Sequence, residues 1–384
     1  MTDTEKLYQE RLNRIMTAVS HQETDSVPVI LQAEAWTISQ CGLKIADIQD
    51  DMQKEFACFG KIFETFYCDG TLFSSMTRDV RATTTLGGSL YFLSSNGITT
   101  QHKESIYMNE DEYAQLTKDP LGYTVNEIFP RKYPELNKPY PQNLEALKES
   151  LNYFNKLIQR SVAGMQFSKD NYGIPTITGA VGEGPLDLIF DFFRGFRGTL
   201  GDLRRRPEEL KEAAEAVLPL IMSVITMGQP TLQPFPFIFL PLHVPTFLSP
   251  KQFGEFYWPG FRKLLYQIKA LGGKALIYLE GNWEHLYEYV NDFPKDFAVC
   301  ILEKDNIFEA KKKIGDTVTL CGGIDLGMLR AASKQECIDH VKEVVDKCAP
   351  GGGFLFSTDK LLLAPGDVNP ENLKAVNEFV HSYK

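Results

Sequence analysis

Short apolar runs alternate with segments of helical periodicity along most of this 384-residue chain. Eight of the runs are rich in β-branched and aromatic residues, and most of them precede a segment whose apolar positions lie three and four residues apart. The predicted strands are 27–31, 66–73, 174–180, 235–240, 275–279, 297–302, 317–321 and 354–357. Alternating strands and helices are typical of parallel sheets, and eight such units predict a single (β/α)8 barrel, a TIM barrel, over residues 1–384.

Helical periodicity also covers the start of the chain and several longer stretches. The predicted helices are 2–20, 48–65, 144–162, 207–227 and 250–271. Residues 80–140 interrupt the alternation, because β-forming residues surround the Gly87-Gly88 pair and the remainder is polar and rich in proline. A glycine pair between β-forming residues is typical of a hairpin turn. We therefore expect an inserted hairpin and loop excursion over the mouth of the barrel.

Polar or charged residues follow nearly every predicted strand. Because the carboxyl ends of barrel strands meet at one face, their side chains are expected to converge on a substrate. The residues at these positions are Gln32 to Glu34, Ser74-Ser75, Glu183, His243, Glu280, Glu303, Asp325 and Asp359.

Three of these residues carry the candidate chemistry: Glu280, His243 and Asp359. Glu280 lies where an apolar run ends and the backbone turns, so its carboxylate could bind a metal or move a proton. The His243 imidazole could be a metal ligand or an acid–base group. Each residue also has a plainer interpretation. Glu280 could be a solvated or capping charge, His243 a hydrogen-bonded loop residue, and Asp359 the ion-pair partner of Lys360.

A basic cluster begins at Arg194 and Arg197 and continues through residues 204–206. Guanidinium groups bind carboxylates or phosphates through paired hydrogen bonds. The alternative is that they neutralise nearby acids such as Asp187 and Asp191. We expect neutralisation for residues 204–206 and leave both roles open for Arg194 and Arg197. The remaining histidines are expected at the surface: His21, His102, His285, His340 and His381.

Composition narrows the class of protein. The hydrophobic content of 43% and the charged content of 23% are ordinary for a soluble globular enzyme. A formal net charge of -10 with only local basic segments argues against nucleic acid as a partner. No apolar run reaches the roughly 18 residues that span a bilayer, so we expect no membrane association and a cytoplasmic location. The seven scattered cysteines contain no C-x-x-C pair, which argues against disulfides and a thiolate zinc site.

The order of several short motifs resembles that of the uroporphyrinogen decarboxylase superfamily, which also contains corrinoid-dependent methyltransferases. The similarity extends from about Asp25 to the C-terminus and rests on the spacing of many weak pieces. These pieces are Asp25-Ser26-Val27-Pro28-Val29, Gly184-Pro185-Leu186, Arg194-Gly195, Asp202 to Glu208, Leu248 to Phe253, Phe256 to Pro259, Leu279 to Asn282, Ile314-Gly315-Asp316, Gly322 to Asp325, Gly352-Gly353-Phe354 and Pro370-Glu371-Asn372. The resemblance implies a (β/α)8 barrel and is strongest to the uncharacterised methyltransferase-like branch.

Residues that define known members of the superfamily are replaced. The decarboxylases carry an arginine after the first strand that binds substrate carboxylates, whereas this chain has no arginine there and contains Glu34. Their aspartate after the second strand corresponds to Ser75, and their histidine after the last strand is replaced around Asp359. The H-x-C pair of the zinc methyltransferases corresponds to Tyr278 and Glu280, and their last cysteine to a residue near Asp359.

The resemblance implies three candidate functions. The first is transfer of a methyl group from a small methylated donor to a separate corrinoid protein, with Glu280, His243 and Asp359 as catalytic residues or as ligands of a zinc ion. The second is cofactor-free decarboxylation of uroporphyrinogen or a related porphyrinogen. The third is non-catalytic binding of a tetrapyrrole or corrinoid. A homodimer is one expected assembly. The candidate substrate-binding residues are Glu34, Ser75, Tyr278, Asn282, Arg194 and Arg197.

Overall fold

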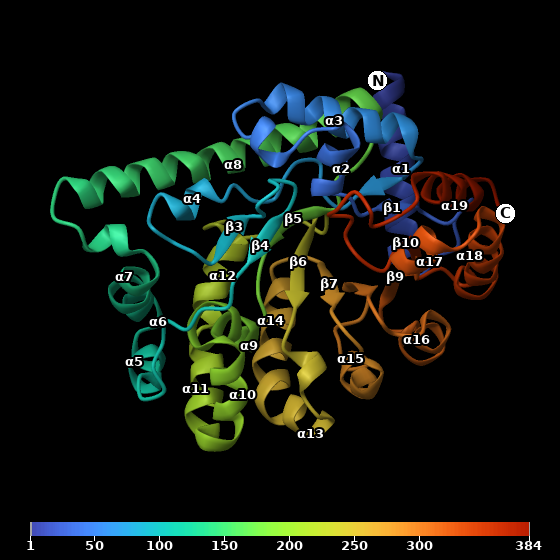
Figure 1. Ribbon diagram of the computed structural model, residues 1–384. Helices are drawn as coiled ribbons and strands as arrows, with labels where there is room; N and C mark the ends of the chain where they lie inside the picture. The colour runs from blue at the N-terminus through green and yellow to red at the C-terminus, as the bar shows by residue number, and fades with distance from the viewer. Residues whose placement is uncertain (1, 384) are drawn as a thin grey trace.

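A six-stranded parallel sheet forms the centre of the computed structural model, which describes residues 2–383. The strand order is β10-β9-β8-β7-β6-β5, and every neighbouring pair is parallel. Helices separate consecutive strands, so all six carboxyl ends lie at the same edge of the sheet (Figure 1). The strands are β5 (Thr178–Val181), β6 (Phe237–Leu242), β7 (Ala275–Leu279), β8 (Ala298–Leu302), β9 (Thr319–Ile324) and β10 (Phe354–Thr358).

Two further short strands, β1 (Ile30–Leu31) and β2 (Gly70–Thr71), pair in parallel beside this sheet. Single bridges connect them to its two edges, Val29 with Phe356 on one side and Thr71 with Thr176 on the other. All eight predicted strands are therefore present. The fold is consistent with a TIM barrel, but the expectation of a closed barrel is only partly met, because the hydrogen-bonded ladder is reduced to isolated bridges at both junctions. Pro28 contributes to this, since it has no amide with which to extend β1.

Alternate residues of the strands belong to two apolar clusters. In β7, Ala275, Ile277 and Leu279 belong to the outer cluster beneath the helices, whereas Leu276 belongs to the inner one. This division follows from the two-residue period of side chains along a strand. The inner cluster fills the space that the strands surround, and its strand-side residues are Ile30, Leu72, Ile177, Phe237, Leu276, Val299, Ile301, Cys321 and Leu355.

Helix α1 (Asp3–Val19) covers the amino-terminal ends of the strands. Its first turn is stabilised by a capping box between Thr2 and Glu5. Its buried residues Ile15, Ala18 and Val19 complete the inner cluster. The opposite, carboxyl-terminal end is consequently where a substrate can enter.

The other helices associated with the sheet lie outside it. Among residues 2–383, no helix is long and apolar enough to cross a membrane. The predicted helix 250–271 is divided into α13 and α14 by a π-helical turn, Phe253–Tyr257. The outer helices are α2 (Ala35–Gln40), α3 (Met52–Thr65), α9 (Pro185–Ile189), α10 (Gly195–Arg205), α11 (Pro207–Ala216), α12 (Leu218–Thr226), α13 (Pro250–Gln252), α14 (Trp258–Ala270), α15 (Tyr287–Val290), α16 (Ile307–Ile314), α17 (Leu326–Ala331), α18 (Lys334–Cys348) and α19 (Pro370–Ser382).

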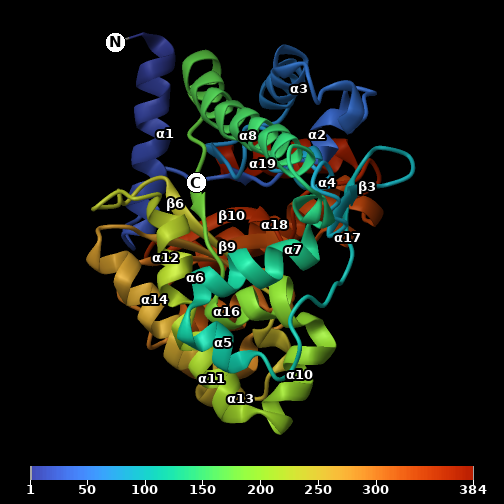
Figure 2. The ribbon, with the colours of Figure 1, turned by 90° about the vertical axis from the view of Figure 1, so that its left-hand side faces the viewer.

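The excursion between β2 and β5 extends along one side of the molecule. The elements are α4 (Arg81–Thr84), β3 (Tyr91–Leu93), β4 (Thr100–His102), α5 (Tyr113–Lys118), α6 (Pro120–Tyr123), the π-helical turn Thr124–Ile128, α7 (Phe129–Lys132) and α8 (Gln142–Tyr172). Figures 1 and 2 show α5, α6 and α7 below the N-terminal end of the long helix α8, and α4 beside α8.

The predicted hairpin exists, but its predicted turn at Gly87-Gly88 is wrong. Strands β3 and β4 pair in antiparallel fashion, and the chain reverses between Ser94 and Thr99, where the Ser94 amide donates to the Thr99 carbonyl. The threonines before Gly87 form α4 instead. The Thr85 hydroxyl donates to the Arg81 carbonyl at 2.8 Å, so these residues take a helical turn despite their β propensity.

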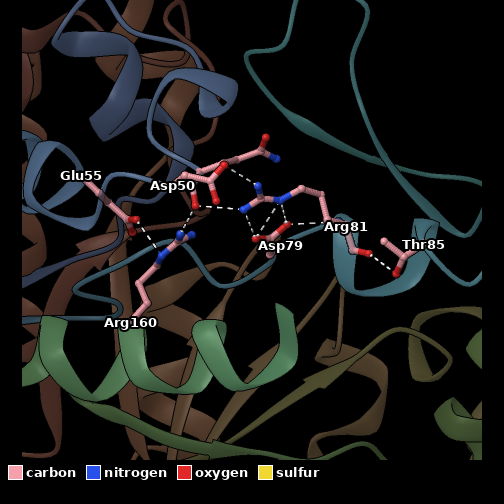
Figure 3. A network of polar contacts seen from close by, with 7 residues as sticks. Asp50, Glu55, Asp79, Arg81, Thr85 and Arg160 are labelled. Carbon is pink, nitrogen blue, oxygen red and sulfur yellow. Dashed lines mark hydrogen bonds and ion pairs between the residues drawn. The ribbon is translucent and has the colours of Figure 1, made fainter. Parts of the chain in front are cut away.

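A network of buried charges fixes the loop that follows β2 (Figure 3). The Glu55 carboxylate accepts a hydrogen bond from the Met76 amide at 2.7 Å and pairs with Arg160 of α8 at 3.1 Å. In the same loop, Asp79 directly follows Arg78 and pairs with Arg81 at 2.6 Å. Residues 76–81 are thus held between α3 and α8.

Candidate active site

A cavity of about 700 Å³ opens at the carboxyl ends of the strands. Its walls come from the residues that follow β1, β2, β5, β6, β7, β8 and β10, and the hairpin β3–β4 lies over it. Proteins with parallel α/β sheets bind their ligands at the carboxyl ends of the strands. The ionisable residues of its wall include Glu34, Arg78, Glu183, Asp191, His243 and Glu280.

His243, which directly follows β6, lies between two carboxylates. Its Nδ1 is 2.8 Å from Oδ2 of Asp191, and its Nε2 is 3.2 Å from Oε2 of Glu280. Burial by itself disfavours a charge on the ring, but the hydrogen bond to Asp191 and the surrounding carboxylates raise the pKa of His243 to about 10. At neutral pH this pKa favours the doubly protonated imidazole, which shares a hydrogen bond with Asp191 through Nδ1 and forms an ion pair with Glu280 through Nε2.

Asp187 positions this histidine from below. The buried Oδ1 of Asp187 accepts hydrogen bonds from the amides of His243 at 2.7 Å and Val244 at 2.9 Å, and its Oδ2 accepts one from the Tyr257 hydroxyl at 2.5 Å. Asp187 and Asp191 lie four residues apart, in α9 and in the π-helical turn Phe190–Arg194 that follows it. They therefore project from the same side of this segment toward the end of β6.

Glu183, which follows β5, is a second proton-bearing group in the cavity. Its Oε2 is buried and has no hydrogen-bond partner within residues 2–383. Burial, followed by the nearby charges of Asp191 and Asp187, raises the pKa of Glu183 to about 8. Glu183 is accordingly a neutral carboxylic acid at pH 7, close to the cationic histidine.

Asp187, Asp191 and His243 could together hold a metal ion, because each offers a ligand atom within 4.8 Å of the others. Asp187 already accepts three hydrogen bonds, whereas Asp191, His243 and Glu280 line the open cavity. A mixed set of imidazole and carboxylate donors fits zinc or another divalent transition metal. Asp191 and His243, which belong to this group and line the cavity, are thus suited to bind a metal ion.

The structure brings Glu280 and His243 together, as their positions at adjacent strand ends predicted, but it places Asp359 elsewhere. Oδ1 of Asp359 accepts a hydrogen bond from the Leu326 amide at 3.0 Å, and this side chain lines a separate hollow beside β9. Burial raises the pKa of Asp359 to about 6. Lys360 pairs with Glu303 at 3.1 Å, rather than with Asp359 as the plainer interpretation expected. The predicted three-residue metal site is therefore not assembled.

The predicted substrate-binding residues divide into two groups. Glu34 and Tyr278 line the cavity; the Glu34 carboxylate is held by the Thr77 amide at 3.0 Å, and the Tyr278 hydroxyl donates to the Asp359 carbonyl at 3.2 Å. Ser75 is buried beside Gly164 of α8, outside the cavity wall. Asn282 is exposed beyond the wall, where its side chain accepts from the Glu284 amide.

The two arginines that had been left open do not line the cavity either. Arg194 is buried and pairs with Asp202 at 2.7 Å, and it also donates to the Met108 carbonyl. This is the neutralising role. Arg197 is exposed on α10. Neither residue is positioned to bind a substrate in the mouth.

Sequence reasoning missed Arg78 and Asp191, and it placed His102 only at the surface. The Arg78 guanidinium stacks on Tyr91 at 3.9 Å from the ring centroid. Arg78 is exposed and lines the cavity, and no carboxylate within residues 2–383 forms an ion pair with it. His102 is exposed but lines the cavity from β4. The available signal for Arg78 was its place three residues after Ser75, in the loop after the second strand.

The strand order and the polar mouth define a (β/α)8-type enzyme fold. A sequence model of the family described as uroporphyrinogen decarboxylase (URO-D) matches residues 118–383, which is more than half of the chain. The chain belongs to this family, which confirms the resemblance found from its motifs. A comparison with curated protein sequences found no significant match.

A solved structure described as a methyltransferase from Methanosarcina mazei is similar over nearly the whole chain. The two share 13% sequence identity with a TM-score of 0.62, and the match covers 96% of this chain and 97% of the other. At this identity the similarity shows a shared fold. It covers the excursion as well as the sheet.

Proposed function

We propose that this protein is a methyltransferase that takes a methyl group from a small methylated donor and passes it to a corrinoid carried by a separate protein. The observation that carries the proposal is the position of the His243 imidazole, which lies between the carboxylates of Asp191 and Glu280 in the cavity. Removing a methyl group from an ether or amine leaves an electron pair on oxygen or nitrogen, and that atom needs a proton.

His243 supplies this proton in the proposed reaction. The bond between the methyl carbon and the donor oxygen breaks, the electron pair remains on oxygen, and Nε2 of His243 protonates it. The pKa of about 10 is close to that of a phenol, which is also about 10, so proton transfer to a phenolate-like leaving group is nearly balanced. Asp191 keeps the ring oriented by accepting from Nδ1, and Glu183 can return a proton to the site. The corrinoid would serve as methyl acceptor when its carrier protein is bound.

Arg78 and Tyr91 suggest the class of donor. The unpaired guanidinium of Arg78 lies in a cavity whose other walls include the aromatic rings of Phe73, Phe192 and Phe239. Aromatic walls accept an apolar ring, and a guanidinium binds a carboxylate through two hydrogen bonds. We infer a methoxylated aromatic carboxylate as the donor.

Zinc is the alternative occupant of the same groups. Asp187, Asp191 and His243 would hold it, because their ligand atoms lie within 4.8 Å of one another, and it would polarise the donor oxygen as a Lewis acid. In that case His243 binds as a neutral ligand and loses its role as proton donor. Metal analysis of protein purified without a histidine tag distinguishes the two cases. Stoichiometric zinc that disappears in Asp191→Ala supports the metal, whereas metal-free protein with full methyl-transfer activity supports the proton donor.

The test of the function uses free cob(I)alamin as the methyl acceptor and 4-methoxybenzoate, methoxybenzene, trimethylamine and glycine betaine as donors. We expect methylcobalamin from 4-methoxybenzoate, a rise in KM of at least tenfold for Arg78→Gln, and a fall in kcat of at least about 100-fold for His243→Gln. His381→Gln, at an exposed position on α19, is the matched control. No methylcobalamin from any donor, together with formation of coproporphyrinogen from uroporphyrinogen, would replace methyl transfer by decarboxylation.

A further inference from the structure

A second cavity, of about 290 Å³, lies beside the mouth. It is enclosed by the excursion on one side, through the turn 124–128 and α7, and by β5 and α12 on the other. Its wall is almost entirely apolar, including Ile128, Leu188, Leu220, Ile221 and Val224. We refer to it as the side pocket.

Lys132, at the end of α7, is the cationic residue of the side pocket. Its side chain is 91% buried, since only 9% of its surface remains exposed. Within residues 2–383, no group forms a hydrogen bond or ion pair with the Lys132 ammonium. Its ammonium is instead surrounded by aromatic rings, at 4.7 Å from the centroid of Phe192, 5.6 Å from Tyr133 and 5.8 Å from Tyr107.

An ammonium in this position is costly for the folded protein. Burial alone lowers the pKa of Lys132 to about 8, so most of the side chains remain charged at pH 7. Contacts with ring faces stabilise the charge only in part. Glu183 also lines the side pocket, but it does not pair with Lys132, and it is itself kept neutral by burial. Within residues 2–383, the Lys132 ammonium therefore has no counter-ion.

We propose that the side pocket binds a small apolar carboxylate, with Lys132 as the counter-ion of the carboxylate and the aliphatic wall around the hydrocarbon. The wall removes the apolar part of such a ligand from water, which stabilises the bound ligand. One ammonium balances one negative charge, so a monocarboxylate fits better than a phosphate with its higher charge. The volume of about 290 Å³ accommodates a chain of roughly eight carbons.

This inference goes beyond the proposed methyl transfer and does not depend on it. The side pocket shares Val181, Glu183 and Phe192 with the wall of the mouth, so a bound acid would contact the same Glu183 from the other side. His243 and Arg78, which line the mouth, do not line the side pocket. Binding at the two sites can therefore be separated by mutation.

The experiment measures octanoate binding to the full-length protein by isothermal titration calorimetry. Octan-1-ol and octylamine have the same chain without the negative charge. We expect the wild type to bind octanoate at least tenfold more tightly than either, and Lys132→Met to lose this preference while still binding octanol. Lys138→Met is the matched control, because Lys138 is exposed and pairs with Glu135 at 2.7 Å. Val224→Glu, which places a negative charge at the rim, should weaken octanoate binding as well.

Two further variants keep the test decisive. Lys132→Arg retains the charge if Lys132→Met does not fold, and it should preserve the preference for octanoate over octanol. His243→Gln should bind octanoate as the wild type does, whatever its effect on methyl transfer. Equal affinity of the wild type for octanoate and octanol would overturn the proposal. So would undiminished octanoate binding by folded Lys132→Met, or loss of octanoate binding in His243→Gln, which would assign the acid to the mouth.

Discussion

At the scale of single residues, the site depends on how three carboxylates surround one imidazole. Glu280 and Asp191 contact the two ring nitrogens of His243, while Asp187 holds its backbone. A cation adjacent to anions is stabilised, and the anions in turn lose part of their mutual repulsion. The positive charge of His243 therefore depends on all three carboxylates together.

Replacing Asp191 by Asn should lower the pKa of His243, because the substitution removes the hydrogen bond and the closest negative charge. In the wild type the raised pKa stabilises the fold fully below pH 6.5, and this contribution disappears as the pH rises through about 10. In Asp191→Asn the contribution should be smaller, and its loss should be complete at a lower pH than in the wild type. The ring protons of His243 followed by NMR report the change, and Asp339→Asn on the exposed face of α18 should leave it unaltered. An unchanged pKa of His243 in Asp191→Asn would show that Asp191 does not raise it.

Glu183→Gln should make the protein more stable at alkaline pH. The pKa of Glu183 is about 8 in the folded protein and 4.5 for a free glutamate, so the folded state binds an additional proton between these values. Stability of the wild type therefore falls as the pH rises from 4.5 to 8. The glutamine has no such dependence, and we expect its relative gain in the free energy of unfolding to grow by about 2 kcal/mol between pH 5 and pH 8.

Urea unfolding at these two pH values measures the gain. The exposed Glu212→Gln variant on α11 is the control. A gain of equal size at both pH values would show that ionisation of Glu183 is not responsible.

At the scale of elements, the strands of the sheet were predicted well, and the excursion less so. Strands have a two-residue period and alternate with helices, so local pattern is enough to locate them. The turn of the hairpin was misplaced because Gly87 and Gly88 suggest a turn, while the threonines before them satisfy their hydroxyls along a helical backbone. The predicted helix 144–162 was too short. Helix α8 continues to Tyr172 and ends where Gly173 adopts a left-handed conformation, with φ +60°.

The packing of α3 against α8 yields a prediction at this scale. Arg160→Met should destabilise the protein by about 3 kcal/mol, because it leaves the Glu55 carboxylate buried without its cation. The double variant Glu55→Gln, Arg160→Met should recover part of that loss, since no buried charge remains. Chemical denaturation of the two variants and the wild type gives these differences. A double variant less stable than Arg160→Met would contradict the explanation.

At the scale of the whole molecule, α8 carries an exposed apolar stripe. One face of the helix, including Ala146, Ser150 and Gly164, is buried against the body. A second face carries six apolar side chains that are between 37% and 62% exposed. They are Leu144, Leu147, Leu151, Phe154, Ile158 and Val162.

The homodimer expected from the sequence would form through this stripe. The stripe residues are three or four positions apart along the whole helix, so the stripe has nearly the same spacing when it is read in either direction. Two copies of α8 can therefore pack antiparallel about a twofold axis near residues 152 and 153. An uncharged stripe of this length is larger than the scattered apolar residues found on monomers. We expect sedimentation at twice the mass of one chain, and a monomer for Leu151→Glu, Phe154→Glu. The variant Asn152→Glu, Asn155→Glu on the neighbouring polar face should remain a dimer. A monomeric wild type would refute this assembly.

The sequence alone determined the βα order, the family and two of the central site residues. His243 and Glu280 could be found because a polar residue that ends an apolar run is a local signal, and parallel strands bring such residues to one edge. Only the tertiary structure decided which other groups join them. Asp191 and Arg78 come from a π-helical turn and a loop, whereas Asp359 turns away to the Leu326 amide. The tertiary structure alone also placed Lys132 of the excursion in the side pocket. The physical reason is that pairing, burial and a shared cavity depend on distances between segments far apart in the chain, which no local pattern contains.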